Sequence, residues 1–169
     1  LSQRLAAFGA DCVVETLGNL QQLKKTAAVQ DDALACKAPK ITFQDGLLDL
    51  STQSADQIFN RWQALSDSVG VSVHFKDKVV KLVELHRPTF EDVAFGAQEE
   101  AKLAVAPGAF FFDKKRQAIW LKCAGDVSSS SSPAWLLVTK LQQQDRKVGS
   151  AVDFANGLRL KHLHREAFQ

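Results

Sequence analysis

The chain has 169 residues, of which 46% are hydrophobic and 24% are charged. This length and composition can supply a buried core, which excludes a disordered protein, and no run approaches the roughly 18 to 20 apolar residues of a membrane-spanning helix. The net charge of +2 is uneven, because residues 101–169 hold 11 Lys and Arg against 5 Asp and Glu. Such a basic segment suits a surface that meets phosphates, although it also suits ordinary solubility.

The first 50 residues are predicted to form an amphipathic helix followed by a linker. Apolar side chains recur about every three or four residues from Leu5 to Leu20, the spacing of one face of a helix over residues 2–23. Such a face needs a partner that covers it. Residues 26–50 lose this periodicity and gather Asp, Lys, Pro39 and Gly46, a composition that predicts a connection between domains.

Residues 51–141 are predicted to hold a short helix and five strands. Ser51 or Ser54 can cap the helix, whose apolar positions extend from Ile58 to Leu65. Residues 87–106 are predicted to be a loop with some helix. The predicted strands, which make two hairpins and a fifth strand, are residues 71–75, 79–85, 109–112, 118–123 and 135–141. This α+β pattern fits a small Greek-key barrel of the oligonucleotide-binding (OB) type, and periodicity alone fits a five-stranded sandwich equally well.

The C-terminal segment is predicted to form a short capped helix. Ser150 is the expected cap of a helix that begins at Ala151, and Gly157 is the expected stop. Before the fifth strand, residues 128–132 are consecutive serines and are predicted to be a flexible insertion. The chain contains no Met, which predicts that it is part of a longer protein with a further N-terminal portion.

The sequence shows no constellation that predicts catalysis. Cys12, Cys36 and Cys123 lack C-x-x-C spacing, and no nucleophile elbow, phosphate-binding loop or H-E-x-x-H is present. His162 and His164 share an H-x-H that can bind a metal adventitiously, but a solvated tail is the preferred interpretation. We therefore predict no catalytic residue, no metal site and no cofactor held by this chain.

Several short stretches, in order along the chain, resemble the end of methionyl-tRNA formyltransferases. Residues 136–160 combine a leucine-rich strand, a basic turn and a Phe-x-Asn-Gly-x-x-Leu ending. Upstream, Ala106-Pro107-Gly108 resembles the family's Ala-Pro-Gly-Thr-Ile strand opening, and residues 122–126 resemble its Cys-Gly-Asp-Gly segment. Two stretches of the predicted linker, residues 30–33 and 38–41, also resemble the interdomain linker of the family.

This resemblance implies a domain organisation. It makes residues 1–25 the last helix of a Rossmann-like catalytic domain, residues 26–50 the interdomain linker, and residues 51–169 an OB-like C-terminal barrel. In the family, the catalytic Asn, His and Asp and the folate-binding loop belong to the catalytic domain, and this chain holds none of them. The resemblance therefore implies that this chain binds initiator tRNA and supplies no catalytic group. It implies that the cofactor 10-formyl-tetrahydrofolate is bound by the parent enzyme and not by this chain. The catalytic domain is then the second expected partner.

The candidate RNA-binding residues are basic positions in the linker and on turns that match the family. Cationic side chains bind phosphates without choosing a sequence, although each one singly is more often a solvated surface charge. Trp120 and Trp135 could stack on bases, but packing within strands is the preferred interpretation. The candidates are Lys37, Lys40, Lys114, Lys115, Arg116, Arg146, Lys147, Arg159 and Lys161.

Two other functions stay open at this point. A non-catalytic formyltransferase-like protein could bind other structured RNA, for instance in mitochondrial ribosome assembly, and a related formyltransferase or hydrolase could act on a small molecule. Residues 65–73 lack the prolines of the bacterial sequences that they resemble. This difference favours a protein of the mitochondrial matrix over the alternative, a protein of the bacterial cytoplasm.

Overall fold

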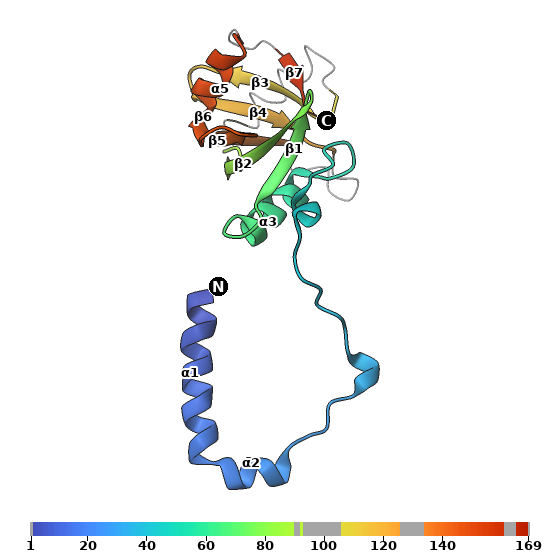
Figure 1. Ribbon diagram of the computed structural model, residues 1–169, viewed down its shortest axis with the longest axis vertical. Coiled ribbons are helices and arrows are strands. Elements are labelled where there is room, and N and C mark those ends of the chain that lie inside the picture. Colours follow the sequence, from blue (N-terminus) through green and yellow to red (C-terminus); the bar gives the residue numbers. More distant parts are fainter. Residues whose placement is uncertain (1, 90–91, 93–105, 126–133, 161–164, 169) are drawn as a thin grey trace. The chain divides into compact units, whose positions relative to one another are not determined.

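The computed structural model describes residues 2–89, 92, 106–125, 134–160 and 165–168 (Figure 1). The chain forms two compact units, Leu1–Pro39 and Lys40–Gln169. The predictions for residues 93–105, for the serines at 128–132 and for Lys161, His162 and His164 lie outside the described residues. No described helix combines the length and the apolarity needed to cross a bilayer.

The first unit contains two helices, α1 (Ser2–Gly18) and α2 (Leu20–Thr26), and a short 3-10 turn, η1 (Asp32–Leu34). The helix predicted over residues 2–23 is confirmed, with a break at Asn19, which precedes α2 as its N-cap. The apolar stripe of this unit is exposed, because Phe8 and Leu17 each keep 67% of their surface and Val14 keeps 73%.

The second unit opens with the 3-10 turn η2 (Phe43–Gly46) and the helix α3 (Ala55–Leu65). Of the two caps proposed for this helix, the structure uses Ser54, whose hydroxyl accepts from the amide of Gln57 while its own amide donates to Gln57 Oε1 at 2.9 Å. This reciprocal capping box satisfies two amides that the first turn leaves unpaired. Between η2 and α3, the side chains of Leu48 and Leu50 are buried in the core.

All five predicted strands are present in one curled antiparallel sheet, which makes the fold α+β. The sheet follows the order β1-β2-β5-β4-β3-β7, and β6 pairs with β5. Two short strands, β6 and β7, were not predicted. The strands are β1 (Val71–Phe75), β2 (Lys78–His86), β3 (Ala109–Asp113), β4 (Ala118–Lys122), β5 (Trp135–Gln143), β6 (Gly149–Ser150) and β7 (Arg165–Ala167).

The antiparallel register points three turns in the same direction. Gln143 at the end of β5 pairs with Val80 near the start of β2, so the β1–β2 turn (residues 76–77) and the β5–β6 turn (residues 144–148) adjoin. The β3–β4 turn (residues 114–117) lies nearer the middle of β5, because Ile119 near the start of β4 pairs with Val138. Each of the three carries basic residues.

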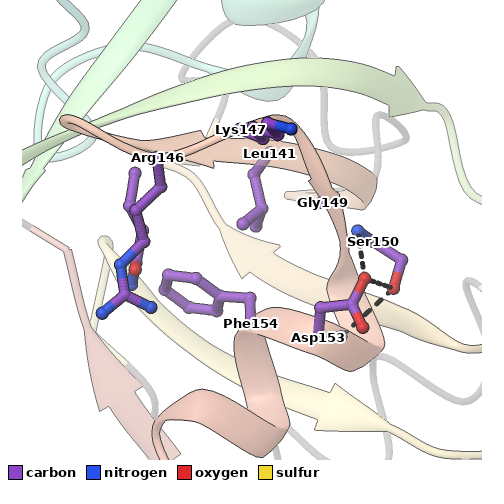
Figure 2. A pocket seen from close by; sticks show the side chains of 8 residues that line it. Leu141, Arg146, Lys147, Gly149, Ser150, Asp153 and Phe154 are labelled. Carbon is purple, nitrogen blue, oxygen red and sulfur yellow. Dashed lines mark hydrogen bonds between the residues drawn. The ribbon is translucent and has the colours of Figure 1, made fainter.

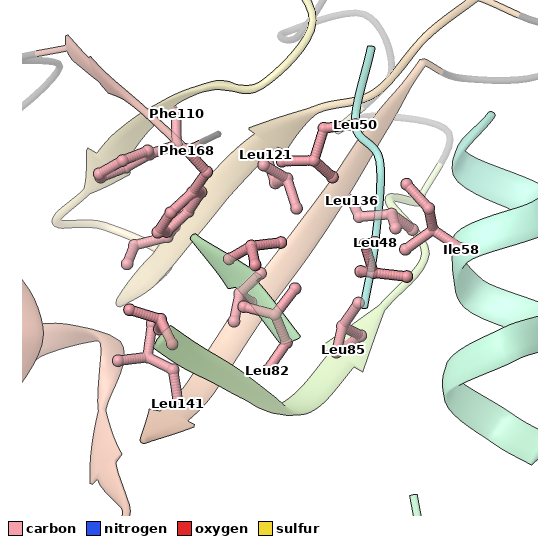
Figure 3. Packing of buried hydrophobic residues seen from close by; sticks show 14 of the residues in the cluster. Leu48, Leu50, Ile58, Leu82, Leu85, Phe110, Leu121, Leu136, Leu141 and Phe168 are labelled. Carbon is pink, nitrogen blue, oxygen red and sulfur yellow. The ribbon is translucent and has the colours of Figure 1, made fainter. Parts of the chain in front are cut away.

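The main core lies on the inner face of the curled sheet, and α3 and the C-terminal helix α5 (Ala151–Gly157) contribute to it (Figure 3). The rings of Phe75, Phe110, Phe154 and Phe168 contact one another and form its aromatic centre. The rings of Phe110 and Phe168 stack with centroids 4.2 Å apart. Alternate residues of a strand face opposite sides. A second buried cluster therefore forms on the other face from Phe111, Ala118, Trp120, Trp135 and Leu137, which confirms the packing role predicted for both tryptophans.

Gly108, the glycine of the Ala-Pro-Gly motif, joins β3 to its neighbours. Its φ is +87°, its amide donates to the Lys122 carbonyl at 2.8 Å, and its carbonyl accepts from the Phe168 amide at 2.8 Å. A Cβ at this position would lie 2.7 Å from the Phe168 carbonyl oxygen. The position therefore requires glycine both for its backbone conformation and for its close contact.

We expect Gly108→Ala to lower the free energy of unfolding by about 1 to 3 kcal/mol, the range for a strained backbone residue. Urea unfolding followed by circular dichroism measures this loss. Gly125→Ala is the matched control, because a methyl group there meets no described atom within 4 Å. An equal loss in the two variants would contradict the strain argument.

Candidate nucleic-acid interface

Two adjoining cavities open where the β1–β2 turn, the β5–β6 turn and α5 meet. Their volumes are about 320 and 360 Å³, and they share Gln143, Arg146, Asp153 and Phe154 in their linings. We call the two cavities together the turn groove. Their remaining lining residues are Phe75, Lys76, Asp77, Lys78, Val80, Leu141, Lys147, Gly149, Ser150, Gly157 and Leu158.

The β1–β2 turn is tight, and it places two lysines at the groove. The predicted strands leave residues 76–78 for the turn, but Phe75 pairs with Lys78, so only Lys76 and Asp77 make it and Lys78 begins β2. Lys76 has a φ of 53°, which lies in the left-handed region that a two-residue hairpin turn requires. Lys76 in the turn and Lys78 directly after it both line the larger cavity.

The β5–β6 turn holds Arg146 and Lys147 above the groove. Asp145 has a φ of 63°, the Arg146 amide donates to the Gln143 carbonyl at 3.0 Å, and the Gln142 side chain donates to the Arg146 carbonyl at 2.8 Å. These bonds fix the backbone from which both cationic side chains project. Figure 2 shows Arg146 reaching from this turn toward the side of Phe154.

The helix α5 is fixed beneath the turn by a second capping box. The amide and the hydroxyl of Ser150 donate to Asp153 Oδ2 at 3.0 and 2.7 Å, and the Asp153 amide donates to the Ser150 hydroxyl at 3.1 Å. The Ser150 hydroxyl and amide lower the pKa of the Asp153 carboxyl. Asp153 is thus ionised at neutral pH, and its carboxylate is turned toward the cap (Figure 2).

The charge of the turn groove is positive overall. Lys76, Lys78, Arg146 and Lys147 line it together with only two carboxylates, Asp77 and Asp153. Within the described ranges, no ion pair joins any of these four cations to a carboxylate. Unpaired cations around a cavity favour an anionic ligand, and polyanions gain further affinity through release of counterions.

Arg116, a candidate from the β3–β4 turn, is engaged inside the protein. Its Nε donates to Asp92 Oδ1 at 2.5 Å and its Nη1 donates to Asp113 Oδ2 at 2.9 Å. The guanidinium also lies 5.6 Å from the ring centroid of Trp120. The side chain keeps 31% of its surface, so Arg116 presents part of its charge at the surface while it binds two carboxylates.

The other candidates occupy several places. Arg146 and Lys147 are brought together in the turn groove, whereas Lys114 and Lys115 are exposed on the β3–β4 turn and line neither cavity. The remaining described candidates are exposed and line neither cavity: Lys37, Lys40 and Arg159, the second residue after α5. Sequence reasoning missed Lys76 and Lys78, although it predicted the turn that carries them.

The described residues contain no group of three or more His, Cys, Asp or Glu that could hold a metal ion. Cys12 is half-buried and Cys36 is exposed, whereas Cys123 is buried. Burial raises the pKa of the Cys123 thiol to about 12, so the thiol stays protonated at neutral pH.

Comparison with known proteins assigns the family. Residues 40–159 match the model of the family described as "Formyl transferase, C-terminal domain". Proteins named methionyl-tRNA formyltransferase are similar over most of the chain. The one from Acidobacterium capsulatum is 31% identical over 153 residues, which cover 90% of this chain and 42% of the relative. The one from Chlorobium chlorochromatii is 32% identical over 167 residues, which cover 98% of this chain and 46% of the relative.

The protein of the same name from Anaeromyxobacter dehalogenans is 32% identical over 163 residues, which cover 96% of this chain and 46% of the relative. The chain thus spans less than half the length of these relatives, all of which are bacterial. The matched family segment includes every strand from β1 to β6 and all the residues that line the turn groove. The chain belongs to the formyl transferase C-terminal domain family.

Proposed function

We propose that this chain is the tRNA-binding C-terminal portion of a methionyl-tRNA formyltransferase. In this proposal it positions initiator Met-tRNA so that a catalytic domain outside the chain transfers the formyl group from 10-formyl-tetrahydrofolate. The observation that carries it is the turn groove, where four cations without described ion pairs gather at the end of the sheet. The names of the similar proteins supply the substrate.

The described parts would have separate roles. The exposed apolar side chains of α1 would pack on the catalytic domain, residues 26–50 would connect the domains, and the curled sheet would close as an OB-type barrel. The candidate cations would contact tRNA phosphates, so the chain contributes position to the reaction and no chemical group. The mitochondrial location inferred from the sequence, and its bacterial cytoplasmic alternative, stay predictions.

Salt dependence of tRNA binding tests this proposal. If about four phosphates are neutralised, the logarithm of the affinity for labelled initiator tRNA falls against the logarithm of the salt concentration with a slope of about −3 to −4. Arg146→Ala combined with Lys147→Ala should weaken binding and reduce the size of the slope by about 1.5 to 2. The loss should be similar for every RNA sequence, because phosphate contacts carry no base information.

A matched control removes two cations that are already paired within the protein. Arg87 lies 3.0 Å from Asp56, and Lys140 lies 2.9 Å from Glu84. The double variant Arg87→Ala with Lys140→Ala changes the net charge equally but should leave the slope nearly unchanged. If both double variants lose the same affinity, general charge and not the turn groove governs binding. If the wild-type chain binds no tRNA, the proposed function is wrong.

A further inference from the structure

The lining of the larger cavity combines charged and apolar residues. Lys76, Lys78 and Arg146 outnumber the two carboxylates, Asp77 and Asp153. The apolar part of the lining consists of Phe75, Val80, Phe154 and Leu158. Its volume of about 360 Å³ lies within the range of small-ligand sites, roughly 300 to 1,000 Å³. Binding to phosphates alone requires exposed cations but no apolar cavity. The preferred ligand therefore combines an anionic group with an uncharged planar or apolar group.

The apolar part of the lining is rigid, because it is continuous with the core. The ring of Phe75 lies 5.5 Å from that of Phe110 and 5.9 Å from that of Phe154, measured between centroids. The Phe75 ring also carries Lys76 Nζ at 4.9 Å from its centroid. Phe75 and Phe154 are each only 4% exposed, so packing already orders the apolar part of the lining before a ligand binds.

We propose that this cavity holds one unpaired nucleotide of the bound RNA. The base lies against Phe75, Phe154 and Leu158, and the adjoining phosphates lie between Arg146 and the two lysines. Gln143 lines both cavities and offers an amide donor and an acceptor to the base edge. This inference rests on the proposed function, and it adds that the RNA must present an unstacked nucleotide.

The RNA must be unpaired at this point because of duplex geometry. In an A-form helix the bases are stacked inside the helix, whereas bases in loops, bulges and ends can turn outward and pack on aromatic side chains. Stacking of this kind tolerates every base, since each base has a flat face. We therefore expect a preference for an unpaired nucleotide with little preference for its identity.

Gly157 offers a variant that adds a side chain to the lining of the cavity without removing a charge. Gly157 lines the larger cavity, and a Cβ there meets no described atom within 4 Å. A leucine side chain can therefore enter open space without displacing its neighbours, and it replaces a helical glycine by a better helix former. Gly125→Leu is the matched control, since Gly125 is equally unobstructed but lines neither cavity.

The test uses the full chain and two RNA hairpins, one fully paired and one with a single bulged nucleotide. The wild type should bind the bulged hairpin about tenfold more tightly. Gly157→Leu should abolish this preference, whereas Gly125→Leu should keep both the preference and the affinity for the paired hairpin. Circular dichroism and thermal melting check that each variant is folded.

A second measurement needs no variant. Titration of the isotope-labelled wild type with adenosine 5′-monophosphate should shift the NMR signals of Phe75, Phe154 and Leu158, whereas inorganic phosphate should shift mainly the signals of the cationic residues. If the wild type shows no bulge preference and no shift at the apolar residues, the nucleotide cavity is wrong and phosphate binding still stands. If neither hairpin nor initiator tRNA binds, the proposed function fails as well.

Discussion

Replacing Phe110 by Ala is expected to lower the free energy of unfolding by about 4 kcal/mol. The side chain is fully buried, it stacks on Phe168, and its ring lies 6.1 Å from that of Phe154, centroid to centroid. Removing a buried phenylalanine side chain leaves a cavity and typically costs about 3 to 5 kcal/mol. This is a large part of the about 5 to 15 kcal/mol that stabilise an ordinary domain.

Denaturant unfolding of the full chain, followed by tryptophan fluorescence, measures the loss. Phe110→Leu is the matched control, because it keeps an apolar side chain and should lose clearly less stability than the alanine variant. A loss below about 1 kcal/mol for Phe110→Ala would mean that the site can collapse around the missing ring, and that the aromatic centre is not the main source of stability.

Arg116→Ala is expected to cost about 3 kcal/mol, the lower end of the range for removing one partner of a buried ion pair. Its partner Asp113 has a side chain with 0% exposure, and Asp92 has 12%. Burial by itself would raise the pKa of Asp113. The hydrogen bonds from the Arg116 side chain and from the Lys115 and Arg116 amides outweigh burial, and the pKa is lowered from its usual 3.8.

The pH dependence of this loss is a specific signature. In the wild type, the lowered pKa values of Asp113 and Asp92 contribute stability that is complete above about pH 3.8 and disappears as the pH falls through the folded-state pKa values. Without Arg116, burial raises the pKa of Asp113, so stability decreases as the pH rises through that value. The two stability curves should therefore separate at neutral pH and converge in acid.

Lys115→Ala is the control for this prediction. It removes the same charge from the same turn, while the Lys115 amide still donates to Asp113 at 2.9 Å. Its stability should stay within about 0.5 kcal/mol of the wild type, as for most surface substitutions. A pH-independent gap, or an equal loss in the two variants, would show that the two carboxylates do not require the guanidinium.

The sequence predicts the strands and helices of the second unit well, because their signals are local. Alternation of apolar residues marks both hairpins, and Ser54 and Ser150 mark two helix starts that the structure confirms. The break at Asn19 leaves no comparable signal, because the apolar period continues through it. β6 is only two residues long, which is too short for a periodicity to develop.

The candidate site is less predictable, since it depends on contacts between distant residues. Lys76 and Lys78 belong to residues 71–100, where 4 Lys and Arg stand against 6 Asp and Glu, so local charge does not point to them. Only the pairing of β2 with β5 brings their turn beside Arg146. The ion pairs of Arg116 include a residue 24 positions away, which no turn motif could indicate.

The aromatic rings that line the turn groove belong to the core, whereas its cationic residues lie in turns or directly beside them. Evolution can therefore treat the two halves of the site differently. Under the proposed function, a substitution of Lys76, Lys78, Arg146 or Lys147 would change RNA affinity at little cost to folding, so these positions would be free to change with the partner. A substitution of Phe75 or Phe154 disturbs the aromatic centre first, so selection for stability alone preserves the shape of this lining, whatever ligand the groove binds.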